Sequence, residues 1–111
     1  VACFEPRSNT AVTNVFQDAF TEALGAADEI LLGEIHRAER IDPADRLDGQ
    51  AMISQLQEQG RTAEAFSTNQ ALGESLLARN FESEGKTLLV FLSNGSFDGV
   101  IGKVAGQFLE K

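Results

Sequence analysis

Apolar residues recur along the chain in two alternating patterns, short continuous runs and longer stretches with helical spacing. The short runs at residues 1–4, 29–32, 62–66 and 87–92 predict four β-strands. The run at 87–92, TLLVFL, is apolar on both faces, which is typical of a central strand in a parallel sheet. The run at 62–66 is the weakest of the four.

Stretches with helical spacing separate these strands. The first begins at about residue 12, and Gly25 ends it; its apolar stripe consists of Val12, Val15, Phe16, Ala19, Phe20, Ala23 and Leu24. Residues 33–47 carry mixed charge and a proline, and are predicted to be a connection. A second helix is expected from the capping residue Asp48 to Gly60, with Met52, Ile53 and Leu56 on its inner face.

Two further helices are predicted in the second half of the chain. Ser67 and Gln70 have the spacing of a capping box, and Gly85 breaks the helix that would follow. The apolar face of this helix would consist of Leu72, Leu76, Leu77 and Phe81. The final helix would place Val100, Ile101, Val104, Phe108 and Leu109 on one side.

Strict alternation of strands and helices predicts an α/β fold. The expected architecture is a three-layer, Rossmann-like domain with a parallel four-stranded sheet and helices on both faces. The 111 residues suit one domain with a single core, and no internal repeat or long linker divides them. The chain does not begin with Met and starts almost inside a strand, so we expect it to be a piece of a longer protein.

The chain is acidic, with 9 Lys and Arg residues against 17 Asp and Glu residues and a net charge of −8. This balance argues against binding to nucleic acid or to an anionic membrane surface. Cys3 is the only cysteine, which rules out an intrachain disulfide and favours a reducing compartment, with Cys3 as a small buried hydrophobe. Cysteine and histidine spacings typical of metal sites are absent from the sequence.

Polar segments follow the predicted strands at the carboxyl edge of the sheet, where open α/β sheets bind ligands. These are EPRSNT after the first strand, the residues after 32, and SNGSFDG after the last strand. Arg7 is suited to bind a carboxylate or phosphate through paired hydrogen bonds; the alternative is a pair with Glu5 or a helix end. Asn9 or Thr10 could equally be a helix cap.

The SNGSFDG segment offers backbone N–H groups before a helix, which suit an anionic or carbonyl group. It matches neither dinucleotide-binding nor phosphate-binding glycine motifs, so the alternative is a plain strand-to-helix turn. Two interpretations of His36 are open. It is a candidate general base, but a lone histidine more often has a structural role or is merely exposed. The order and spacing of a nucleophilic triad are missing from the sequence, and we predict no catalytic residue.

Three segments in order resemble the C-terminal domain of the Mur ligases, in particular the branch that recycles murein tripeptide. They are FEPRSNT at 4–10, ADE with the strand at 27–32, and LSNGSFDG at 92–99. The resemblance spans nearly the whole chain. Ser96 replaces a common glycine of the family loop, and Asp98 is a second departure.

The resemblance implies a cytoplasmic, ATP-dependent ligase of three domains that acts in peptidoglycan recycling. Such an enzyme joins L-Ala-γ-D-Glu-meso-diaminopimelate to UDP-N-acetylmuramate through an acyl phosphate. ATP and Mg²⁺ bind mainly to the central domain, which this chain lacks, and the UDP-sugar binds to the first. The C-terminal domain positions the peptide amine, so this chain is expected to be inactive alone.

The resemblance also implies which residues bind substrate. The interdomain cleft would be faced by Arg7, Ser8, Asn9 and Thr10. The peptide pocket would be lined, partly through backbone groups, by Ser93, Asn94, Gly95 and Phe97. His36 and Arg37 fall on a conformation-sensitive cleft segment of related ligases.

One departure from the family is large. The family domain begins earlier, with two strands and a motif resembling DDFAHHP, which this chain lacks. The resemblance therefore implies an N-terminally truncated domain with strand order 4-1-2-3 and residues 87–92 at an edge, where they would pair with another chain, another copy or an upstream segment.

The alternative function is a non-enzymatic α/β module that binds a small anion or a protein partner at the carboxyl edge of the sheet. A receiver- or flavodoxin-like domain fits less well, since the first strand lacks an acidic pair and no loop suits a flavin phosphate.

Overall fold

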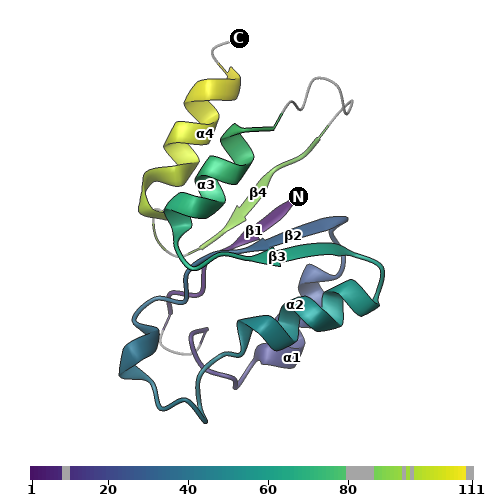
Figure 1. The fold of residues 1–111 in the computed structure, drawn as a ribbon, viewed down its shortest axis with the longest axis vertical. Helices are drawn as coiled ribbons and strands as arrows, with labels where there is room; N and C mark the ends of the chain where they lie inside the picture. Colours follow the sequence, from purple (N-terminus) through teal and green to yellow (C-terminus); the bar gives the residue numbers. More distant parts are fainter. Residues whose placement is uncertain (9–10, 80–86, 94, 96, 110–111) are drawn as a thin grey trace.

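Four parallel strands form one sheet in the computed structural model, which describes residues 1–8, 11–79, 87–93, 95 and 97–109. Along the chain these strands are β1 (Ala2–Phe4), β2 (Glu29–Leu32), β3 (Thr62–Ala65) and β4 (Val90–Leu92). Their spatial order is β3-β2-β1-β4 (Figure 1). Both the parallel α/β fold and the predicted strand order are confirmed.

Helices cover both faces of this sheet. Figure 1 shows α1 (Gln17–Leu24) and α2 (Gly49–Glu58) on one face, and α3 (Asn69–Leu77) and α4 (Val100–Leu109) on the other. Two short 3₁₀ turns, η1 (Ala38–Arg40) and η3 (Phe97–Gly99), lie in the connections after β2 and β4. The three expected layers are therefore present.

The apolar core has two halves, one on each side of the sheet. Ile30 and Leu32 pack with α1 and α2, whereas Leu31 and Cys3 pack with α3 and α4. Because successive side chains of a strand point to opposite faces, β2 must be apolar at every buried position. Burial also raises the pKa of the Cys3 thiol to about 11, which agrees with Cys3 as a buried hydrophobe.

The β4 strand lies at the sheet edge, although its sequence pattern is typical of a central strand. It pairs with β1, and the side chains of Val90 and Leu92 are 38% and 42% exposed. The strand is also shorter than the predicted 87–92 run, since residues 87–89 lie outside it. The edge position is the one that the family resemblance implied.

The first helix begins five residues later than its apolar stripe predicts. Backbone hydrogen bonds join residues 12–14 to 45–47: Asn14 N–H donates to the Asp45 carbonyl and Leu47 N–H to the Val12 carbonyl. These bonds hold the segment outside a helix, so Val12 is buried by the connection and Val15 is 68% exposed. The prediction of helix from about residue 12 was therefore wrong, while the end at Gly25 is confirmed.

Helix caps were predicted with mixed success. Asp48 caps α2, as its carboxylate accepts a hydrogen bond from Ala51 N–H at 3.0 Å. In α3 the cap is Thr68 rather than Ser67, because the Thr68 hydroxyl accepts from Ala71 N–H at 3.1 Å. Gln70 consequently falls outside a capping box and donates to Glu74 instead.

The predicted inner faces are mostly buried. In α2, the side chains of Met52, Ile53 and Leu56 are buried on the inner face, as expected. In α4, Val100 and Val104 are buried but Ile101 is exposed, so Ile101 lies off the packed face. Phe81 and Gly85 lie outside the described residues, as do the side chains of Phe108 and Leu109. Among the helices of the described segments, none has the length and apolarity to cross a membrane.

A bidentate ion pair ties the end of α3 to the start of β2. Both guanidinium nitrogens of Arg79 donate to the two carboxylate oxygens of Glu29, one of them at 2.6 Å. The hydrogen bonds from Arg79 lower the pKa of Glu29 below its ordinary value of 4.5. This pair links Arg79, which follows α3, electrostatically to the sheet.

The Glu29–Arg79 pair predicts an acid-dependent loss of stability. The pKa of Glu29 is lower in the folded chain, so the stabilisation is present above pH 4.5 and disappears as the pH falls through the folded-state pKa. We expect Arg79→Met to lower the free energy of unfolding by about 1 kcal/mol at pH 7 and by much less at pH 3. Urea denaturation at both pH values measures this, with Arg61→Met as control. An equal loss at both pH values would contradict the assignment.

Candidate functional site

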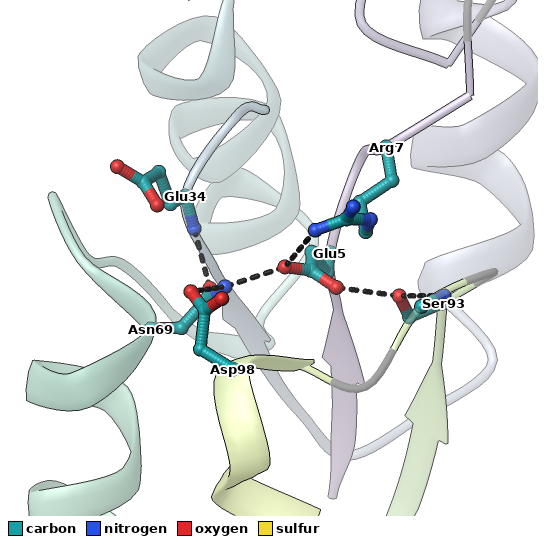
Figure 2. A network of polar contacts seen from close by, with 7 residues as sticks. Glu5, Arg7, Glu34, Asn69, Ser93 and Asp98 are labelled. Atoms are coloured by element: carbon teal, nitrogen blue, oxygen red, sulfur yellow. Dashed lines mark hydrogen bonds and ion pairs between the residues drawn. The ribbon is translucent and has the colours of Figure 1, made fainter. Parts of the chain in front are cut away.

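A buried carboxylate lies at the carboxyl end of β1. Glu5 is only 3% exposed, and both of its carboxylate oxygens accept hydrogen bonds. Ser93 Oγ donates to Oε1, and Asn69 Nδ2 donates to Oε2 (Figure 2). Glu5 thereby joins the end of β1 to the end of β4 and to the start of α3, and its burial is compensated by charge-assisted hydrogen bonds.

Asn69 forms the centre of this polar network. It is the first residue of α3 and is 1% exposed. Its Oδ1 accepts from Glu34 N–H at 2.9 Å, while its Nδ2 donates to Asp98 Oδ2 at 2.9 Å as well as to Glu5 (Figure 2). Sequence reasoning missed Asn69 and Asp98, because an asparagine at a helix start looks like an ordinary capping residue.

Two glycines allow close approaches within this network. A Cβ added at Gly33 would overlap Asn69 Oδ1, and a Cβ added at Gly95 would lie 2.5 Å from Arg7 Nε. The Arg7 side chain therefore lies across Gly95. This contact brings together two of the residues predicted to bind substrate, one from each end of the chain.

Arg7 makes a loose ion pair and stays accessible. Its NH1 lies 3.8 Å from Glu5 Oε2, and 30% of its side chain is exposed. Its alternative role as a partner of Glu5 is therefore met by the geometry, yet the long distance leaves the guanidinium group able to bind a ligand as well.

The Arg7 side chain also borders a cationic cavity of about 380 Å³. The cavity is lined by Arg7, Val12, His36, Arg37, Arg40 and Ile41. Three arginines and a histidine are thus gathered in a chain whose net charge is −8. The structure places Arg7, His36 and Arg37, three of the residues predicted to bind substrate, at one cavity, together with Arg40, which the sequence analysis missed.

Backbone contacts position the residues that line this cavity. Gly33 N–H donates to the Phe4 carbonyl and His36 N–H to the Pro6 carbonyl, so the segment after β2 runs beside the segment after β1. Arg37 has a left-handed φ of 53° and precedes η1, which ends at Arg40. Arg37 directly precedes this turn and Arg40 ends it, and both side chains line the cavity.

The other predicted site residues have different surroundings. Ser8 Oγ accepts from Ala11 N–H at 3.0 Å, which forms a local turn. Ser93 is part of the Glu5 network and also accepts from Gly95 N–H. The Phe97 ring is fully buried and packs edge-on against Phe91, so its ring belongs to the core. Asn9, Thr10 and Asn94 lie outside the described residues.

A second cavity, of about 490 Å³, lies on the other side of Asn69 between α3 and α4. Its charged lining consists of Glu34, Glu74, Asp98 and Lys103. The carboxyl edge of the sheet therefore has a mainly cationic cavity and a mainly acidic one, and the segment after β2 contributes residues to both. Within the described part of the chain, no group of three or more His, Cys, Asp or Glu side chains has an arrangement that could hold a metal ion.

The chain is similar to a curated Mur ligase over almost its whole length. It is 31% identical over 110 residues to the UDP-N-acetylmuramate–L-alanine ligase of Methylibium petroleiphilum strain PM1. The similarity supports the Mur ligase family. The aligned region covers 99% of this chain but 22% of the relative, so the chain spans about a fifth of that ligase. No family model matches the chain, and no solved structure does.

The surroundings of Gly33 and Gly102 differ, so we expect alanine substitutions at these two positions to have opposite effects on stability. Gly33→Ala forces a methyl group against the Asn69 amide oxygen and should lower the free energy of unfolding by about 1–3 kcal/mol. Gly102→Ala, in α4, places its methyl group in open space and should raise it by about 0.5–1 kcal/mol. Urea denaturation measures both, and a neutral Gly33→Ala would contradict the tight contact.

Proposed function

We propose that the chain is the C-terminal domain of an ATP-dependent Mur ligase that acts in peptidoglycan recycling. The full-length ligase would join L-Ala-γ-D-Glu-meso-diaminopimelate to UDP-N-acetylmuramate. The observation that carries the proposal is the cationic cavity formed by Arg7, His36, Arg37 and Arg40 at the carboxyl edge of the sheet. The Mur ligase similarity and the EPRSNT and SNGSFDG segments support it.

The chemistry of the tripeptide fits this cavity. The peptide carries several free carboxylates, on its glutamate and diaminopimelate residues, and a free amino group on its alanine. Arginine binds carboxylates through two parallel hydrogen bonds, so three arginines around one cavity suit a polycarboxylate. The neighbouring acidic cavity with Glu34, Glu74 and Asp98 makes the edge complementary to the ammonium groups of such a peptide.

In this proposal the domain positions the peptide and does no covalent chemistry. ATP and Mg²⁺ would bind mainly to the central domain of the full-length ligase, where the muramoyl carboxylate is activated as an acyl phosphate. Closure of the C-terminal domain would bring the peptide amine to that centre and exclude water. The isolated chain is accordingly proposed to be inactive.

The arginines of the cavity predict the binding behaviour of the isolated chain. Arg7→Ala and Arg37→Ala should each weaken binding of the tripeptide by about tenfold or more, because each removes charge-assisted hydrogen bonds. Isothermal titration calorimetry measures this. The control is Arg61→Ala, because Arg61 donates to the Gly25 carbonyl outside the cavity.

Two outcomes would contradict the proposal. The first is a tripeptide affinity that is unchanged in both Arg7→Ala and Arg37→Ala but reduced in Arg61→Ala. The other is a preference for free L-alanine, the amino acid in the relative's name, over the tripeptide. The second outcome would keep the Mur ligase family and reject the recycling substrate.

A non-enzymatic anion-binding module is the second candidate, since the same cationic cavity also suits a small anion. In that case inorganic phosphate would compete with the tripeptide at comparable concentrations. The full-length protein would then also fail to form UDP-N-acetylmuramoyl-tripeptide from ATP, UDP-N-acetylmuramate and tripeptide. The ligase proposal predicts product formation and tripeptide binding that phosphate displaces only weakly.

A further inference from the structure

The Asn69 side chain contacts three separate strand-end segments at once. Its oxygen faces the Glu34 N–H after β2, and its nitrogen faces Glu5 after β1 and Asp98 after β4. Both N–H groups and one oxygen lone pair are used, and the side chain is buried. Only one orientation of the carboxamide satisfies these partners, because the reverse would place its oxygen against two carboxylates.

Each of these three segments also carries residues of the proposed peptide site. Arg7 follows Glu5 by two residues, His36 follows Glu34 by two, and Ser93 and Gly95 shortly precede Asp98. The segments that carry these residues are thus joined through a side chain from a fourth element, α3. Figure 2 shows Asn69 beside Asp98, with Glu5 between Asn69 and Arg7.

Hydrogen bonds, one loose ion pair and one close contact connect Asn69 to the cationic cavity. Glu5 accepts from Asn69 and from Ser93, whose hydroxyl in turn accepts from Gly95 N–H at 3.0 Å. Gly95 lies beneath Arg7, and Arg7 pairs with Glu5. On the other side, the Glu34 segment leads to His36, whose N–H donates to the Pro6 carbonyl.

We propose that Asn69 is a positioning residue of the peptide site, whose carboxamide holds the segments after β1, β2 and β4 in one arrangement around the cationic cavity. Asn69 does not line that cavity and acts through Glu5, Glu34 and Asp98. The identity of the ligand rests on the proposed function. The coupling between Asn69 and the arginines can be measured without any ligand.

Asn69→Asp tests this role with almost no change in volume. It removes both N–H donors and places a third carboxylate beside those of Glu5 and Asp98, so the segments should separate. In the free chain we expect the NMR signals of Glu34 N–H and Arg7 Nε–H to shift. Tripeptide affinity should fall about tenfold, since small displacements of positioning groups have large effects.

Two control variants separate positioning from stability and from charge. Thr68→Ala removes the cap of the same helix one residue away, without touching the three contacts of Asn69. Asn14→Asp makes the same chemical change at an exposed asparagine that bonds the Ala44 carbonyl. Both should leave the Arg7 Nε–H signal unchanged, whatever their effect on the unfolding midpoint. Asn14→Asp should also leave the tripeptide affinity unchanged.

A second test variant covers the case in which Asn69→Asp does not fold. Asp98→Gly removes one partner of Asn69 and relieves the left-handed φ of 53° at that position, so it should keep the fold. It should still shift the Arg7 Nε–H signal. An unchanged Arg7 signal in a folded Asn69→Asp chain, or in Asp98→Gly if the first variant does not fold, would overturn the proposal.

The two proposals can fail separately. If the wild-type chain binds no tripeptide, the proposed ligand is wrong, but the shift of the Arg7 signal still decides the role of Asn69. If the tripeptide binds and Asn69→Asp binds it as tightly as Asn14→Asp does, the positioning role is rejected and the proposed function stands.

Discussion

The buried Glu5 carboxylate is the constraint on which the structure at the carboxyl ends of the strands depends. A carboxylate this well buried is costly unless hydrogen-bond donors surround it. Here the donors come from Ser93 after β4 and Asn69 at the start of α3, with the Arg7 guanidinium 3.8 Å away. The edge can therefore form only when β1, β4 and α3 are in place together, which makes it a product of the whole fold rather than of any loop.

This arrangement separates structural charges from charges that remain available to a ligand. Glu5 and Asp98 are engaged by Asn69, whereas Arg37 and Arg40 line a cavity with Arg7 and His36. A polar network that contacts an accessible cationic cavity through Arg7 agrees with the proposed role, in which the domain positions a substrate for chemistry done elsewhere. The relative of which this chain spans about a fifth is itself a ligase, so the proposed function assigns that chemistry to the rest of such an enzyme.

Local signals predicted the fold well where they acted alone. The run at 29–32 coincides with β2, and Asp48 caps α2, because burial pattern and capping chemistry are properties of a few neighbouring residues. The prediction failed where distant backbone intervened. Residues 12–16 have a helical stripe, yet hydrogen bonds to residues 45–47 keep the chain at 12–14 out of a helix. At the start of α3 two adjacent residues have hydroxyl groups, and the N-cap is Thr68 rather than Ser67.

The sequence by itself determined the alternation of strands and helices, the parallel sheet and the polar segments at one edge. These follow from apolar periodicity and from the geometry of parallel strands. Only the tertiary structure decided that Arg40 joins Arg7 and Arg37, that Phe97 belongs to the core and that Asn69 links the strand ends. The physical reason is separation along the chain: Ser93 and Glu5 are 88 residues apart, and Asn69 and Glu5 are 64 apart. Such pairs leave no local pattern, because their hydrogen bonds exist only once the sheet has brought its strand ends together.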